Sequence, residues 1–192
     1  MTSFDCFGAV FCGKLDFIVD YGEIPLLYVI SSMSQLNTEQ LMAVYSEGNI
    51  ENADAFFPDF SREEQIKKAE SAFVDYLRED FFQQKGAAYY VWESDGVYRS
   101  ALRLEPYLDG LLLEALETAP DSRRKGYGYA LICAVLSHLK GKSVGPIYSH
   151  VSKRNVPSLK IHEKCGFQRI KESAAYIDGT VTQNSCTMCY YL

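Results

Sequence analysis

The spacing of apolar positions along the chain predicts a mixed α/β protein. Apolar residues that alternate with polar ones are typical of half-buried strands, whereas apolar residues three or four positions apart are typical of amphipathic helices. By this criterion strands are expected at 9–12, 15–19, 26–30, 87–93, 97–104, 111–117, 146–151, 167–177 and 182–192. Helices are expected over 37–45, 61–84, 126–139 and 155–165, and residues 49–60 are expected to form a loop.

Short polar signals mark the starts of these helices. Asn37 or Thr38 is expected to cap the first helix, because a side-chain oxygen there accepts a hydrogen bond from a free amide of the first turn. Ser61-Arg-Glu-Glu has the spacing of a capping box. Asn155 is expected to cap the last helix. The resulting order of elements predicts a mixed, mostly antiparallel sheet with helices on both faces.

Composition limits the class of protein further. The chain has 192 residues, of which 47% are hydrophobic and 23% charged, so one globular domain is expected. No apolar run approaches the roughly 20 residues of a membrane span, and the first residues lack the basic region of a signal peptide. We therefore expect a cytoplasmic protein that does not bind membranes. Its six cysteines, including the C-x-x-C at Cys186 and Cys189, are expected to be structural thiols rather than a metal site.

Charge is divided unevenly along the chain. The net charge of −6 is made up of −8 over residues 1–60, −5 over 61–120 and +7 over 121–192. The acidic total argues against nucleic-acid binding. The split suggests two electrostatic tasks, with an anion bound by the basic last third and a cation by the acidic remainder.

The clearest chemical motif is Arg123-Arg-Lys-Gly-Tyr-Gly128, between a predicted strand and a predicted helix. Glycines let the backbone approach a ligand closely, and free amides at a helix start attract anions, so the loop suits a phosphate or pyrophosphate. A Walker loop would need Lys-Ser/Thr after its glycine, and a Rossmann turn would need a third glycine at Leu131. Neither pattern is present.

The pattern that fits is R-x-x-G-x-G, at Arg123, Gly126 and Gly128, which resembles the acyl-CoA signature of the GNAT superfamily of N-acetyltransferases. Downstream, the segment 155–167 resembles the second block of that family, N-x-x-A/S-x-x-L-Y-E-K-x-G-F. The resemblance covers residues 87–192 by motif and 26–86 by element order. It implies one GNAT-like domain over 1–192, with an extra N-terminal hairpin at 1–25, an acceptor side at 26–120 and a CoA-binding half at 121–192.

The resemblance implies acetyl-CoA as co-substrate, with no metal. Backbone groups near the end of the third central strand would hold the thioester and pantetheine, and the glycine loop would hold the pyrophosphate. The residues implied to bind the cofactor are Leu116, Thr118, Arg123, Arg124, Lys125, Gly126, Tyr127, Gly128, Tyr129, Asn155, Ser158 and Lys164.

One position departs from the family pattern. His162 stands where the family commonly has a tyrosine that protonates the leaving CoA thiolate. Histidine can carry out that proton transfer, since its reference pKa is about 6.5. The alternative is a histidine that only packs against its neighbours.

The general base is expected on the strand before the glycine loop. Glu114 and Glu117 are both candidates, with Glu117 nearer the loop. Their spacing of three places them on opposite faces of a regular strand, and on one face only if a bulge intervenes, as is usual in the family. Water-mediated proton transfer is the third option. Tyr89, Tyr90, Trp92 and Tyr107 are aromatic options for the acceptor pocket.

Three hypotheses of function follow. The first is an N-acetyltransferase that moves an acetyl group directly from acetyl-CoA to a primary amine of a small molecule or peptide, acting as a monomer or homodimer. The acidic part of the chain suits a cationic acceptor. The second is a non-catalytic acyl-CoA sensor, suggested by the missing tyrosine. The third is a nucleotide-phosphate binder that uses the same loop.

Overall fold

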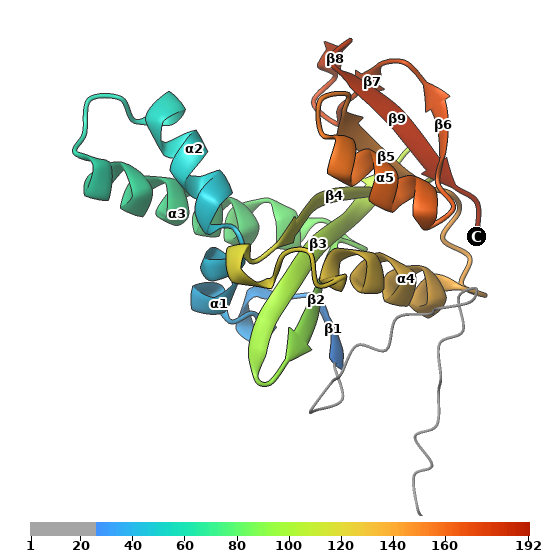
Figure 1. The fold of residues 1–192 in the computed structure, drawn as a ribbon, viewed down its shortest axis with the longest axis horizontal. Helices are drawn as coiled ribbons and strands as arrows, with labels where there is room; N and C mark the ends of the chain where they lie inside the picture. The colour runs from blue at the N-terminus through green and yellow to red at the C-terminus, as the bar shows by residue number, and fades with distance from the viewer. Residues whose placement is uncertain (1–25) are drawn as a thin grey trace, which may run out of the picture.

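The computed structural model describes residues 26–192, so the strands expected at 9–12 and 15–19 lie outside the described part (Figure 1). Within it, the strands are β1 (Leu26–Ile30), β2 (Ala88–Ser94), β3 (Val97–Tyr107), β4 (Gly110–Thr118), β5 (Ile147–Ser152), β6 (Gln168–Lys171), β7 (Ala174–Ala175), β8 (Val181–Thr182) and β9 (Ser185–Tyr190). The helices are α1 (Thr38–Val44), α2 (Ser46–Phe56), α3 (Arg62–Glu79), α4 (Tyr127–Leu139) and α5 (Val156–Lys164), with 3₁₀ turns at Met33–Gln35, Phe81–Gln83 and Pro120–Ser122.

One mixed sheet forms the centre of the described region. Its strand order is β1-β2-β3-β4-β5-β9-β6, and β7 pairs with β8 in a small separate ribbon. Every neighbouring pair in the large sheet is antiparallel except β4 and β5, which run parallel. The prediction of a mostly antiparallel sheet is thereby confirmed. The sheet opens at this parallel pair.

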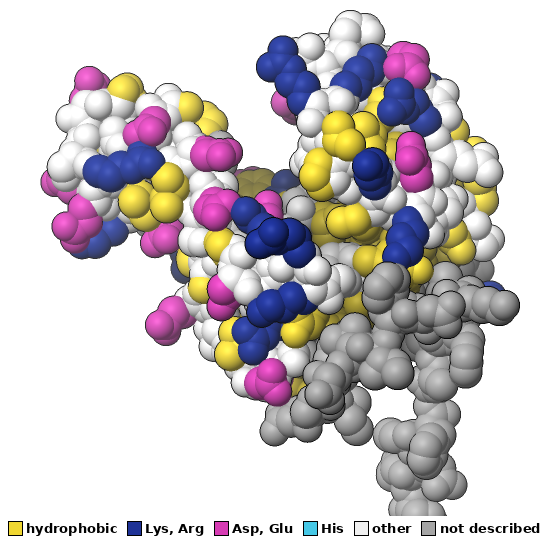
Figure 2. Space-filling model, viewed as in Figure 1, with side chains coloured by type: hydrophobic (Ala, Val, Ile, Leu, Met, Phe, Trp, Pro, Cys, Tyr) yellow, Lys and Arg dark blue, Asp and Glu magenta, His cyan; other side chains and the backbone are white. Residues whose placement is uncertain are grey.

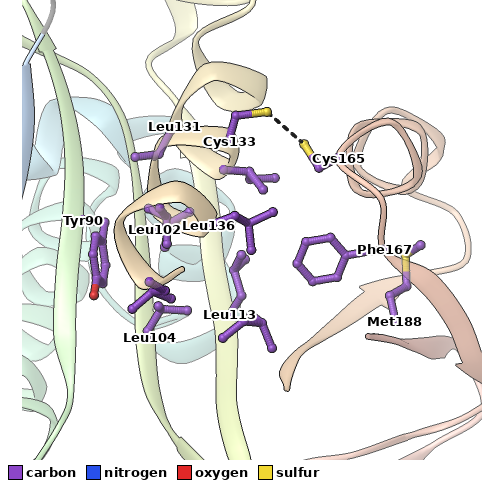
Figure 3. Close-up of a cluster of buried hydrophobic side chains, with 14 of the residues drawn as sticks. Tyr90, Leu102, Leu104, Leu113, Leu131, Cys133, Leu136, Cys165, Phe167 and Met188 are labelled. Atoms are coloured by element: carbon purple, nitrogen blue, oxygen red, sulfur yellow. Dashed lines mark hydrogen bonds between the residues drawn. The ribbon is translucent and has the colours of Figure 1, made fainter. Parts of the chain in front are cut away.

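Helices cover both faces of the sheet, as expected. On one face α4 packs on β2, β3 and β4, with α5 beside it over β5. Figure 3 shows the apolar side chains between them, with Leu131 and Leu136 of α4 facing the strands and Cys133 pointing toward Cys165 at 3.9 Å. On the other face α1 and α3 bury a second cluster around Leu41, Leu77 and Tyr89. The strands are therefore held from both sides.

The local signals at helix starts are confirmed. Asn37 caps α1 by accepting a hydrogen bond from the Gln40 amide at 3.1 Å. Ser61 and Glu64 form the reciprocal capping box at the start of α3. Among the described residues, no helix combines the length and the apolar character needed to cross a membrane.

The prediction of a loop over 49–60 is wrong, because most of these residues belong to α2. Gly48 lies inside α2. Glycine costs about 1 kcal/mol in a helix interior relative to alanine, and packing offsets that cost. Ala53 is completely buried and Asn49 nearly so, and α2 packs along α3. This contact is tertiary, so the local pattern did not indicate it.

Two further boundaries differ from expectation. The helix expected to reach 84 ends at Glu79, and a 3₁₀ turn at Phe81–Gln83 follows it. The strand expected over 167–177 is divided into β6 and β7, because β6 pairs with β9 whereas β7 turns away to pair with β8. This division places a short ribbon next to the site described below.

Candidate functional site

The central sheet opens between β4 and β5. These two strands are paired only from Leu111–Ile147 to Leu113–Ser149, although β4 continues to Thr118 and β5 to Ser152. Beyond Leu113 the edge of β4 that faces β5 therefore has no strand partner. Figure 2 shows the surface hollowed between the α2–α3 side and the β6–β9 side of the molecule. Backbone polar groups on such an edge are available to a ligand.

A bulge reshapes β4 at this opening. Ala115 has a φ of 52°, and the pairing with β3 skips from Arg103–Glu114 to Ala101–Glu117. Because Ala101 and Arg103 are two residues apart, they lie on one face of β3, and so do their partners Glu114 and Glu117 on β4. Of the two arrangements considered from the sequence, the structure has the one with both glutamates on the same face.

The glycine loop forms the start of α4 next to that edge. Gly126 caps the helix with a φ of 87°, which favours glycine, and Arg124 also has a positive φ of 63°. In the first hydrogen bond within the helix, the Ala130 amide donates to the Gly126 carbonyl. The amides of residues 127–129 therefore have no acceptor within the helix. A Cβ on Gly128 would lie 3.2 Å from Thr118 Oγ1, so glycine allows α4 to approach β4 closely. Free amides at the start of a helix are a setting that favours an anion.

The basic side chains of the loop have different surroundings. Arg124 and Lys125 are exposed, and Figure 2 shows Lys and Arg side chains over this loop and over α5. Arg123 instead contacts Glu47 at 2.5 Å and Glu117 at 3.1 Å, and its Nε donates to the Thr118 carbonyl at 3.2 Å. Its guanidinium therefore holds the end of β4, the loop and α2 together.

The second sequence block forms the start of α5. Asn155 Oδ1 accepts a hydrogen bond from the Ser158 amide at 3.1 Å and caps the helix, as predicted. Lys164, at the other end of α5, places its Nζ 4.3 Å from the ring centre of Tyr129 on α4. The two blocks that were distant in sequence are therefore neighbours around the opening.

His162 is buried between α5 and β5. Its side chain is 1% exposed, with Nε2 at 3.0 Å from Ser149 Oγ and Nδ1 at 2.8 Å from the Ser158 carbonyl. A carbonyl only accepts, so Nδ1 carries the proton of the neutral ring and Nε2 accepts from the Ser149 hydroxyl. Burial lowers the pKa of His162. Ser149 is the residue at which β4 and β5 part.

The two candidate bases have unequal settings. Glu114 accepts a hydrogen bond from Arg103 Nη2 at 2.9 Å, and both side chains are less than one-fifth exposed. Buried Glu105 has its Oε1 3.8 Å from Arg103 Nε, and desolvation, followed by the neighbouring Glu114, raises its pKa. Glu117 is 35% exposed at the mouth of the opening, next to Arg123. Glu114 thus belongs to a buried cluster of charged side chains, whereas Glu117 is accessible from solvent.

His150 is a residue of this region that the sequence analysis missed. It lies on β5, in ring contact with Tyr107 at 5.4 Å and Tyr176 at 5.0 Å, and neither ring nitrogen has a hydrogen-bond partner among the described residues. Burial lowers its pKa, while the charge of Glu114 acts to raise it. A single histidine in a strand matches no motif, so only the fold brings it beside Glu114.

A family model identifies the family to which the chain belongs. The model of the acetyltransferase (GNAT) family matches residues 51–167, which is more than half of the chain. The chain belongs to the GNAT family of acetyltransferases. The matched range contains the opening, the bulge, the glycine loop and α5. Among the described residues of this GNAT chain, no group of three or more His, Cys, Asp or Glu side chains is arranged to hold a metal.

Curated relatives match the GNAT chain over short segments. An N-acetyltransferase 9-like protein of Schizosaccharomyces pombe is 31% identical over 70 residues, which are 33% of this chain and 32% of that protein. A mycothiol acetyltransferase of Saccharomonospora viridis is 30% identical over 61 residues, 32% of this chain and 20% of that protein. The matches thus span a third or less of these relatives.

Solved structures share the GNAT fold over most of the chain. The PaiA N-acetyltransferase of Thermoplasma acidophilum, solved in complex with coenzyme A, has a TM-score of 0.56 at 14% identity, covering 87% of this chain and 99% of that one. The ribosomal-protein-S18-alanine N-acetyltransferase of Escherichia coli has a TM-score of 0.55 at 18% identity, covering 88% and 94%. At such identities the likeness concerns the fold alone.

Proposed function

We propose that this protein is an acetyl-CoA-dependent N-acetyltransferase that transfers the acetyl group directly to a primary amine. The observation that carries the proposal is the opened edge of β4, bulged at Ala115, beside the free amides at the start of α4. An extended pantetheine chain can pair with such an edge, and a pyrophosphate suits such a helix start. The two features are adjacent, as one CoA molecule requires.

The proposed cofactor site uses both blocks. The amides of Gly126–Tyr129, with the exposed Arg124 and Lys125, hold the pyrophosphate. The edge from Leu116 to Thr118 holds pantetheine and the thioester carbonyl. Asn155, Ser158 and Lys164 line the α5 side. Arg123 contributes by fixing the loop through its contacts with Thr118, Glu117 and Glu47.

Glu117 is the proposed base, directly or through a water. The amine must be neutral when its nitrogen attacks the thioester carbon, so its proton has to leave toward an acceptor on the acceptor face. Glu117 lies on that face and is partly exposed. Both glutamates are paired with an arginine, but Glu114 and Arg103 are less than one-fifth exposed, whereas Glu117 and Arg123 are 35% and 40% exposed, which leaves Glu114 the second choice.

His162 is the proposed acid, acting through Ser149. As the C–S bond breaks, the CoA sulfur takes the electron pair and then a proton from the Ser149 hydroxyl, and Ser149 takes the Nε2 proton of an imidazolium at His162. This route needs the doubly protonated ring, which burial disfavours, whereas the negative charge on the leaving sulfur favours it. Protonation of the thiolate should therefore accelerate as the pH falls.

A non-catalytic CoA sensor is the second candidate, favoured by the complete burial of a neutral His162. One experiment separates the two. The protein is incubated with acetyl-CoA and a panel of primary amines, and release of the CoA thiol is followed. We expect turnover of at least one amine class. A thermal shift with CoA but no turnover of any amine would favour the sensor, and a larger shift with ATP or NAD than with CoA would contradict both.

A further inference from the structure

A cavity of about 630 Å³ lies between α2 and α3, at the side of the β4 bulge. Its wall contains Tyr45, Phe56, Phe57, Phe73, Tyr76 and Ala115, and we refer to it as the aromatic cavity. Small-molecule sites typically have volumes of about 300–1,000 Å³ and apolar walls. None of the aromatic residues singled out from the sequence for an acceptor pocket lines it, because α2 was expected to be a loop.

The aromatic cavity adjoins the reaction centre proposed above. Ala115, the bulged residue of β4, is part of its wall, and the Tyr45 hydroxyl donates to the Ala115 carbonyl at 2.5 Å. Burial is the largest cause of the raised pKa of Tyr45, followed by Tyr89, and the charge of Glu117 adds a smaller rise. A ligand in the cavity can therefore reach the bulge with one end.

Charge is arranged differently at the two ends of this space. Glu47 precedes the wall residue Gly48 and is linked through Arg123 to Glu117, so two carboxylates stand at the bulge end with one guanidinium between them, which leaves one net negative charge. The wall itself includes no residue that is charged at neutral pH; its polar members are Asn49 and the two tyrosine hydroxyls. A second ammonium or a sugar in the cavity would find in the wall only Asn49, the tyrosine hydroxyls and the ring faces, which replace its lost hydration poorly because the wall has no carboxylate.

We propose that the acceptor is a monoamine whose amino group is carried by an aromatic or alkyl body, with that body in the aromatic cavity and the amino group between Glu117 and the bulge. This inference rests on the proposed N-acetyltransferase function and specifies its substrate class. Burial of one methylene contributes about 0.8 kcal/mol, which is a factor of about 4 in kcat/KM. A phenyl ring should therefore raise kcat/KM by a factor of at least about 10 over the bare alkylamine.

The test compares amines that differ only in the body. Values of kcat/KM are measured for ethylamine, hexylamine, 2-phenylethylamine and spermidine with the full chain and acetyl-CoA. We expect 2-phenylethylamine and hexylamine to exceed ethylamine by at least tenfold and spermidine to be the poorer substrate. Equal values for all four, or a preference for spermidine, would overturn the proposal.

Two variants on α3 test whether the apolar body of the amine binds in the aromatic cavity. Ala72 lines the aromatic cavity and is exposed in the empty cavity, so Ala72→Leu should partly fill it without disturbing the core. Its neighbour Ser71 is also exposed but lies outside the aromatic cavity, which makes Ser71→Leu the matched control. We expect Ala72→Leu to lower the ratio of kcat/KM for 2-phenylethylamine over ethylamine about tenfold, and Ser71→Leu to leave it unchanged.

Failure of this inference is distinguishable from failure of the proposed function. If no amine is acetylated although CoA binds, the proposed function is wrong. The cavity is then tested by the thermal shift that 2-phenylethylamine produces in the presence of CoA. A shift that Ala72→Leu removes and Ser71→Leu keeps would support an apolar amine as the ligand, and the absence of any shift would refute it.

Discussion

At the residue scale, His162 is held at both ring nitrogens, by Ser149 of β5 and by the Ser158 carbonyl of α5. Its ring also lies edge-on to Phe167 at 5.1 Å. The same contacts serve two purposes in the proposal. They fix the Ser149 hydroxyl at the point where β4 and β5 separate, and they join α5 to the sheet. Substitutions can separate these purposes, since Ser149 is needed only for the first.

Ser149→Ala should lower kcat and remove its rise toward low pH, because the proton route to the CoA sulfur is broken while the ring stays in place. A general acid contributes about 10² to 10⁴ in rate where the step it assists is limiting. The KM for acetyl-CoA should change little. His162→Phe should show the same kinetic loss. It should also lower the free energy of unfolding by about 1–3 kcal/mol, since it leaves the buried Ser149 hydroxyl without its imidazole partner.

Two measurements test this. The first is the pH dependence of kcat, obtained from the rate of CoA release, and the second is urea unfolding of each variant. If Ser149→Ala keeps the wild-type pH profile, His162 has a structural role only.

Glu117→Gln should lower kcat/KM about 10² to 10⁴-fold at neutral pH, because the amide cannot accept the proton of the amine. The loss should shrink as the pH rises and more of the amine is already neutral. Glu114→Gln is the matched variant on the same face. It should chiefly lower stability, because the mostly buried Arg103 would lose the negative charge of its hydrogen-bond partner. The reverse result, with Glu114→Gln more damaging to kcat/KM at equal stability, would assign the base to Glu114.

At the element scale, the start of α4 is attached to the end of β4 by close backbone packing. Gly128 faces Thr118 Oγ1, and the Arg123 guanidinium donates to the Thr118 carbonyl. The amides proposed to bind the pyrophosphate and the β4 edge proposed to bind the thioester thus belong to one packed unit. A change that separates helix from strand should affect CoA binding before it affects the fold.

Gly128→Ala should weaken CoA binding at least tenfold, because the added Cβ, 3.2 Å from Thr118 Oγ1, pushes α4 from β4. Gly126→Ala should do the same through backbone strain, since its φ of 87° costs an L-residue about 1–2 kcal/mol. Gly48→Ala is the control, because it lies inside α2 with nothing within 4 Å and should stabilise the protein by about 0.5–1 kcal/mol. Isothermal titration with CoA measures the effect, and unchanged affinity in both loop variants would place the pyrophosphate elsewhere.

At the scale of the whole molecule, His150 and His162 have pKa values lowered chiefly by burial. Below about pH 6.5 these histidines bind protons in the unfolded chain but stay neutral in the folded chain. The free energy of unfolding should therefore fall as the pH drops from about 7. Each fully shifted histidine contributes at most about 1.4 kcal/mol per pH unit. Glu105 opposes this trend at the acidic end, because its pKa is raised and the folded state takes up its proton first.

Urea unfolding at pH 7.5 and pH 5.5 tests this expectation. His150→Phe should reduce the difference between the two values, because it keeps the ring contacts with Tyr107 and Tyr176 and removes a titrating group. It should also raise stability at pH 7.5, since two unpaired ring nitrogens leave the buried region. A wild-type protein that is equally stable at both pH values would contradict the argument.

Much of the fold could be predicted from the sequence, and for a local reason. The caps at Asn37, Ser61 and Asn155 and the positive φ of Gly126 depend on a few consecutive residues, so their patterns are visible in the chain. The helix α2 could not be predicted, because its stability comes from packing on α3. The site divides in the same way, with the glycine loop readable and His150 and the aromatic cavity not.

The sequence by itself determined the order of elements, the anion-binding loop and the family resemblance, because backbone conformation and helix capping are set by neighbouring residues. Only the tertiary structure decided which residues meet. The bulge at Ala115 turned Glu114 and Glu117 to one face, Arg123 joined the acidic α2 to the basic loop, and burial between Ser149 and Ser158 set the protonation of His162. These outcomes depend on contacts between residues far apart in the chain. Such contacts set the protonation state of a side chain and the atoms that it can touch.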